Sequence, residues 1–152
     1  MNFLKAGMYK LPEYMQLRQA VESNALPAVA TGLSGIHKAT IINALVQDTN
    51  KTALLLASDE AEAQRICQDL TSMGLRSFIY PTRDFTFRNV ESASREYEYQ
   101  RIQVLSRILK HDCDIVIACM DAALQYTIPP NELEGRMIEL KKGQTVSLEQ
   151  VV

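Results

Sequence analysis

The sequence lacks any apolar run long enough to cross a membrane. Its longest nearly apolar stretches, residues 52–57 and 114–120, fall far short of the roughly 20 residues that a spanning helix requires. The N-terminal residues 1–14 also lack the continuous apolar core and the small-residue cleavage site of a secretory signal. We therefore expect no membrane span and a cytoplasmic location.

The sequence also has few cysteines and a low net charge. Cys67, Cys113 and Cys119 are odd in number and form no C-x-x-C pair, which argues against a disulfide framework and against a zinc site. The net charge of −2 gives no general attraction to phosphate backbones, so nucleic acid is not an expected partner of this segment alone.

Six basic residues between positions 83 and 110 are the local exception to the weak net charge. Acidic residues are interleaved with them, which favours a solvated helix or loop face over a nucleic-acid site. The six are Arg83, Arg88, Arg95, Arg101, Arg107 and Lys110.

What the chain does contain is an alternation of helical and strand patterns. A length of 152 residues with 47% hydrophobic residues is enough for one domain with a core. The patterns predict helices at 12–23, 38–48, 60–73 and 95–110, a short helix from 121, and strands at 26–32, 51–58, 75–81 and 113–120. Because each strand is apolar on both faces, the fold class is α/β, a three-layer parallel sheet with helices on both faces.

Three local signals refine this prediction. Asp59 and Glu62 match the N-cap and N3 positions of a capping box, and Gly74 suits the end of the same helix. In the helix at 95–110 we expect Ile102, Leu105, Ile108 and Leu109 to face inward. The segment 82–94 has no clean period and is predicted to be a long surface loop anchored by Phe85 and Phe87.

Residues 32–39 nearly match a phosphate-binding loop. The pattern G-x-x-x-x-G-K-[ST] needs glycines for backbone wrapping, a lysine for phosphate charge and a hydroxyl for magnesium. Gly32, Gly35 and Lys38 are present, but His37 replaces the second glycine of the pattern and Ala39 replaces the hydroxyl residue. A disabled loop is the preferred interpretation, while a live site and an unrelated turn stay open.

No catalytic constellation is recognisable elsewhere. Asp121 follows an apolar strand, as a magnesium-positioning carboxylate would, but it also precedes a helix start, and a helix cap is the better interpretation. His37 and His111 have no neighbouring cysteine or carboxylate cluster in the sequence. We therefore predict no catalytic residue, no metal site and no cofactor for this segment.

The order of these segments resembles the start of the bacterial transcription-repair-coupling factor (Mfd) family. The resemblance covers nearly all of residues 8–152. It rests on the altered loop "TGLSGIHKATIINAL", on Pro81, Arg83 and Asp84, and on "DAALQ" followed by Pro129 and Pro130. That region of the family is similar to the first domain of the excision-repair subunit UvrB, whose phosphate loop is intact.

The resemblance implies a P-loop (RecA- or helicase-like) domain with a degenerate phosphate loop. It also implies a non-catalytic scaffold module of a protein that uses ATP to release RNA polymerase stalled at DNA lesions and recruits repair through UvrA. The ATP and magnesium sites, and the contacts with DNA and RNA polymerase, would belong to the full-length protein. Two alternatives remain: a nucleotide-binding domain of a UvrB-like ATPase, and an autoinhibitory module for a motor domain.

A change of composition after residue 130 predicts a domain boundary. We expect a UvrB-like α/β domain at 1–134 and the truncated start of a following domain at 135–152. The second part should contain a short strand at 136–141, a turn at Gly143 and a capping box formed by Ser147 and Gln150.

Overall fold

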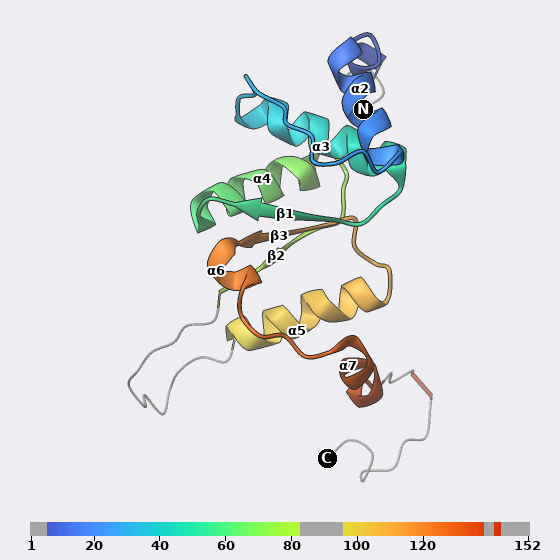
Figure 1. Ribbon diagram of the computed structural model, residues 1–152. Coiled ribbons are helices and arrows are strands. Elements are labelled where there is room, and N and C mark those ends of the chain that lie inside the picture. Colours follow the sequence, from blue (N-terminus) through green and yellow to red (C-terminus); the bar gives the residue numbers. More distant parts are fainter. Residues whose placement is uncertain (1–5, 83–95, 139–141, 144–152) are drawn as a thin grey trace.

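A parallel three-stranded sheet forms the centre of the molecule (Figure 1). The computed structural model describes residues 6–82, 96–138 and 142–143. The strands are β1 (Ala53–Ala57), β2 (Ser77–Tyr80) and β3 (Ile115–Cys119). Their order is β1-β3-β2, so the strand that comes last in the sequence lies in the middle.

Helices cover both faces of this sheet, as predicted. The helices are α2 (Pro12–Glu22), α3 (Gly35–Thr49), α4 (Glu60–Ser72), α5 (Glu96–Leu109), α6 (Met120–Ala123) and α7 (Pro130–Arg136). In Figure 1, α3 and α4 lie above the sheet, α2 lies above α3, and α5 lies below the sheet. The α/β class and the parallel sheet are therefore confirmed, whereas a likeness to P-loop domains is not shown.

The central strand β3 explains why its sequence is apolar without alternation. Ile115 and Ile117 are fully buried against α3 and α4, and Val116 and Ala118 are buried on the α5 side. A middle strand of a parallel sheet contacts helices on both faces, so both sets of side chains are apolar.

The edge strand β1 differs from the prediction that helices cover both faces of each strand. Leu55 is half-buried on the side of α3 and α4, but Leu54 and Leu56 are 65% and 46% exposed on the other face. The second core cluster, which includes Val104 of α5, contains residues of β2 and β3 and none of β1. β1 is consequently apolar on both faces but buried on only one.

The predicted strand at 26–32 is wrong. Within the residues that the structure describes, this segment has no strand pairing and is exposed throughout, including Val29 at 85%. It forms an extended connection, drawn in blue in Figure 1, that runs from the end of α2 across α3 to the start of α3. Apolar composition indicated a strand here, but no pairing partner lies beside it, and Pro27 has no amide donor.

The helix at 95–110 is confirmed as α5, and its inward face was predicted correctly in part. Leu105 packs against the second core cluster and Leu109 is half-buried, but Ile102 and Ile108 are exposed. Two other residues of this helix are buried instead, Arg101 at 2% exposed and Val104. Arg101 was expected to be solvated. Instead its guanidinium donates to the Pro81 carbonyl at 2.7 Å, because α5 crosses the carboxyl end of β2 at this residue.

The C-terminal predictions are tested only in part. Arg136 ends α7, a helix that the sequence pattern did not indicate, so the predicted strand does not begin at 136. Gly143 lies in a turn with a φ of +89°, as expected. Residues 139–141 and 144–152, with the proposed capping box, and residues 83–95, with Phe85 and Phe87, lie outside the described part of the chain. Over the described ranges, no helix has both the length and the apolar character needed to cross a membrane.

Candidate functional site at the carboxyl edge of the sheet

The altered phosphate loop begins α3 and is shorter than a working loop. Ser34 is the N-cap residue and Gly35 is the first residue of the helix. His37 and Lys38 therefore have helical backbone, and His37 avoids the left-handed conformation that its Cβ would have strained. Gly32, with a φ of +76°, makes the turn that precedes the helix. The backbone from 35 to 38, which would wrap a phosphate in a working loop, is used for helix formation.

The side chains at the altered positions are committed to local contacts. His37 Nδ1 lies 3.0 Å from the Ser34 hydroxyl oxygen, one turn before it on the helix. Ala39 is fully buried and belongs to the core cluster between the sheet, α3 and α4. Thr40 donates its hydroxyl to the Ile36 carbonyl at 2.8 Å, so this hydroxyl does not replace the missing magnesium ligand.

Lys38 is paired with a carboxylate of the neighbouring helix. Its ammonium nitrogen lies 3.3 Å from Glu62 Oε1, in the first turn of α4 directly after β1. The site therefore lies at the carboxyl edge of the sheet, where parallel α/β folds bind ligands. Here, however, the lysine has a protein carboxylate as its partner.

Glu62 is held in its charged form. It accepts hydrogen bonds from the Ser58 hydroxyl at 2.6 Å and from the Ser58 amide at 3.0 Å. These bonds, followed by the contact with Lys38, lower the pKa of Glu62 from 4.5 to about 2. The carboxylate is thus ionised throughout the physiological range and neutralises Lys38.

Asp59 caps α4 as predicted. Its Oδ1 accepts from the Glu62 amide at 2.7 Å, and its backbone is extended as an N-cap requires. The predicted cap at Asp121 is wrong, because Cys119 is the N-cap of α6 and Asp121 lies inside that helix. The strand therefore continues directly into α6 without a side-chain cap.

Negative charge gathers at this edge. Burial raises the pKa of the Cys119 thiol first, and the nearby carboxylates of Glu60, Asp59 and Asp121 raise it further. The same carboxylates oppose a polyphosphate, since like charges repel across short distances in a partly buried site.

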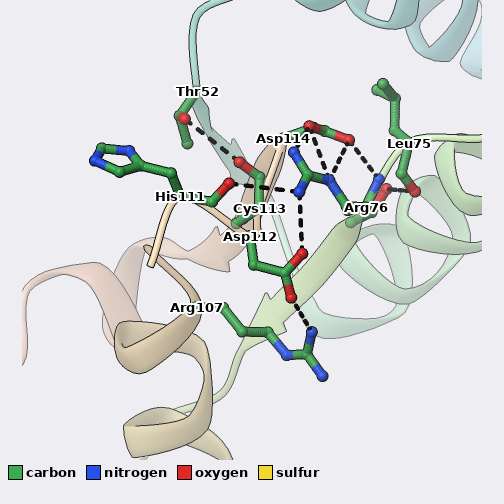
Figure 2. Close-up of polar contacts among 9 residues, drawn as sticks. Thr52, Leu75, Arg76, Arg107, His111, Asp112, Cys113 and Asp114 are labelled. Atoms are coloured by element: carbon green, nitrogen blue, oxygen red, sulfur yellow. Dashed lines mark hydrogen bonds and ion pairs between the residues drawn. The ribbon is translucent and has the colours of Figure 1, made fainter. Parts of the chain in front are cut away.

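A second polar cluster lies at the opposite, amino edge of the sheet (Figure 2). The Arg76 guanidinium bonds both carboxylate oxygens of Asp114 and, at 3.0 Å, Asp112, which also accepts from Arg107 at 2.8 Å. These bonds lower the pKa of Asp114. The cluster connects residues just before β2 and β3 with the last turn of α5. Its two cations and two anions balance, which is typical of a structural tie.

A third cluster attaches α2 to α3. The carboxylate of Asp48, whose side chain is 2% exposed, accepts from the hydroxyls of Tyr9 at 2.8 Å and Tyr14 at 2.6 Å. Burial raises the pKa of Tyr14, and the bond to Asp48 raises it further. The helix pattern placed Tyr14 on α2, but nothing in the sequence singled out Asp48 as its partner.

A cavity of about 850 Å³ lies between α2, the 28–33 segment and the first turns of α3. Its walls are mainly apolar and include Leu17 and Ile41, with His37 and Thr40 at the α3 side. The cavity adjoins the altered loop but lies away from Glu62, so Lys38 does not line it.

The remaining candidate residues are dispersed. His37 is on α3, and His111 lies beyond α5, beside the amino-edge cluster. Cys67, Cys113 and Cys119 are free thiols. Across the described ranges, no three histidine, cysteine, aspartate or glutamate side chains are grouped so that they hold a metal ion.

Comparison with known proteins gives one distant relationship. The sequence is 32% identical over 104 residues to the transcription-repair-coupling factor of Bacillus subtilis (strain 168). The match covers 67% of this chain but 9% of that protein, so the chain spans a small part of its relative's length. No family model matches the sequence, and no solved structure matches it. The relationship gives a coarse context of transcription-coupled DNA repair.

Proposed function

We propose that this chain is a non-catalytic interaction module of a transcription-repair-coupling factor. The partial similarity supports the protein context, and the Lys38–Glu62 ion pair is the observation that carries the non-catalytic role. In the longer protein, ATP and magnesium would act at a separate motor that releases stalled RNA polymerase and moves on DNA. A cytoplasmic location belongs to the same proposal.

The chemistry of the site supports a module that does not hydrolyse nucleotides. Phosphate binding requires a free lysine and wrapped amides, and here Lys38 is neutralised while residues 35–38 are helical. Magnesium requires a hydroxyl or carboxylate aimed at the phosphates, and Ala39 is buried in the core. A nucleotide would have to break the ion pair and approach Glu60 and Asp121.

The exposed apolar residues support an interaction role. Leu54, Leu56, Met120, Leu124 and Tyr126 are between 46% and 78% exposed. Leu54 and Leu56 lie on the same face of β1, and exposed apolar side chains that share a face are typical of docking sites. UvrA and other domains of the same protein are the proposed partners. An autoinhibitory contact with the motor is one form that such an interdomain contact would take.

Calorimetric titration of the chain with magnesium-ATP tests the non-catalytic role. We expect no heat of binding that corresponds to a Kd tighter than roughly 100 μM. The matched variant is Glu62→Gln, which frees Lys38 and is expected to bind inorganic phosphate weakly without gaining nucleotide affinity. Magnesium-dependent binding of ATP by the wild-type chain would contradict the proposal and favour a UvrB-like nucleotide site.

Two binding experiments test the interaction role. Purified UvrA should bind the immobilised chain, or the chain added in trans should lower the ATPase rate of the relative's isolated motor domains. Leu54→Lys tests whether the exposed face contributes, and Lys110→Ala, a change at an exposed polar position, is the control. If neither UvrA nor the motor responds to the wild-type chain, the interaction role is wrong.

A further inference from the structure

The connection between α6 and α7, residues 124–129, presents two large apolar side chains to solvent. Leu124 and Tyr126 are 77% and 78% exposed, whereas Gln125 between them is half-buried. Single exposed apolar residues are ordinary, but these two flank an inward residue within a run, 122–131, that carries no charge. Because both side chains stand out of the surface, a partner that covers them needs a pocket and not a flat face.

A buried arginine of α5 holds the middle residue of this connection inward. The Arg101 guanidinium donates to the Gln125 side-chain oxygen at 3.0 Å and to the Pro81 carbonyl at 2.7 Å. Its carbon Cζ lies 4.0 Å from the centroid of the Tyr80 ring, and the arginine is 2% exposed. In Figure 1 the connection, drawn in orange, runs past α5. Because Gln125 is bound toward α5, the residues on either side of it are directed into solvent.

Two prolines fix the other end of the connection. Pro129 is the N-cap residue of α7 and Pro130 is the first residue of that helix, and the ring of each restricts its backbone. Leu133, one turn further on, is buried. The connection is therefore held at both ends, so its exposed side chains lose little conformational freedom when a partner covers them. A tyrosine presented in this way is typical of the residues that dominate binding energy.

The size of this surface favours a partner in the same polypeptide. A buried aromatic side chain contributes about 150–250 Å², so two such side chains supply well under the roughly 800 Å² per partner of a stable interface between separate proteins. A covalently linked domain needs less contact area, because the linkage raises its effective concentration. In the matched relative, the aligned region is 9% of the length, so most of that protein lies outside the match.

We propose that Leu124 and Tyr126, held outward by the hydrogen bond between Arg101 and Gln125, dock into an apolar pocket of another domain of the same longer protein. This inference rests on the proposed function and specifies one of its interdomain contacts. Gln125 is a positioning residue and does not enter the pocket. Because the connection carries no charge, the docking should not weaken as salt concentration rises.

Hydroxyl-radical footprinting, measured by mass spectrometry, tests this contact. The modification rates of the Leu124 and Tyr126 side chains are compared between the 152-residue chain and the full-length protein that carries it. We expect both rates to be at least about threefold lower in the full-length protein, the factor for a docked fraction of about two-thirds. Tyr99, a tyrosine of α5 that is 67% exposed, is the control and should keep its rate.

Variants of the full-length protein separate docking from positioning. Tyr126→Ser changes an exposed position and should return the Leu124 rate to its value in the 152-residue chain. Gln125→Ala removes the acceptor of Arg101 and should raise the rates of both exposed side chains, whereas Gln125→Glu keeps an acceptor oxygen and should keep both rates low. If Gln125 had a purely structural role, Gln125→Ala would lower the melting temperature and leave both rates low, which would overturn the positioning role.

Unchanged rates at Leu124 and Tyr126 in the full-length protein would overturn the docking. Equal protection of Tyr99 would also overturn it, because the shielding would then not be specific to the connection. Low rates in the 152-residue chain that rise on dilution would show that a second copy is the occupant, with the same consequence. In each case the proposed function still holds if the chain binds UvrA or lowers the ATPase rate of the motor, so the two failures are distinguishable.

Discussion

Neutralising Glu62 should weaken the fold in a pH-dependent manner. Glu62→Gln keeps the shape of the side chain but removes its charge from Lys38 and from the Ser58 donors. The pKa of about 2, against 4.5 for a free glutamate, corresponds to about 3 kcal/mol if fully realised, since one pKa unit is about 1.4 kcal/mol. The Glu62 side chain is 24% exposed, so solvent screens part of its interaction with Lys38. We therefore expect Glu62→Gln to lower the free energy of unfolding by about 1–2 kcal/mol at pH 7.

The pH dependence separates this charge effect from a packing effect. Because the folded-state pKa of Glu62 lies below the unfolded one, its stabilisation is complete above about pH 4.5 and is lost as the pH falls toward 2. Urea unfolding of wild type and Glu62→Gln at pH 7 and pH 3 measures the difference, with Glu60→Gln in the same helical turn as the control. The predicted charge effect is wrong if Glu62→Gln lowers the free energy of unfolding no more than Glu60→Gln does at pH 7. It is also wrong if the effect of Glu62→Gln is the same at pH 3 as at pH 7.

Three further substitutions test the other contacts. Tyr14→Phe removes the shorter tyrosine donor from the buried Asp48 carboxylate and should lower the free energy of unfolding by about 1.5–3 kcal/mol in urea titrations. Ala39→Ser places a hydroxyl in the core and should cost about 1–2 kcal/mol without producing magnesium-dependent ATP binding in calorimetry. Arg76→Met should lower the melting temperature at neutral pH, and thermal unfolding should show this difference in melting temperature narrowing below pH 3.8 as Asp114 protonates.

The elements that could be predicted from the sequence are those whose signals are local. The cap at Asp59, the helix that it begins and the stop at Gly74 depend on neighbouring backbone groups, and all three are present in the structure. The central strand was recognisable because helices on both faces demand apolar side chains at every position.

The failures concern contacts between distant parts of the chain. Arg101 was expected to be solvated, because its burial depends on the Pro81 carbonyl and on the Tyr80 ring, whose centroid lies 4.0 Å from the guanidinium carbon. The ion pair between Lys38 and Glu62 joins residues 24 positions apart. The phosphate-loop pattern predicted that this helix begins at Lys38, but α3 begins at Gly35. Ser34, a residue type that favours the N-cap position, was the local signal for the earlier start.

The position of β3 in the middle of the sheet has a consequence for synthesis on the ribosome. β1 and β2 do not pair with each other, and both depend on a strand that is translated about 35 residues after β2 ends, as the bounds at Tyr80 and Ile115 show. Long-range pairing of this kind is slow and leaves apolar segments uncovered while the chain grows. A nascent chain that stops before residue 115 lacks the strand that joins β1 to β2, so this sheet forms only after residues 115–119 have been made.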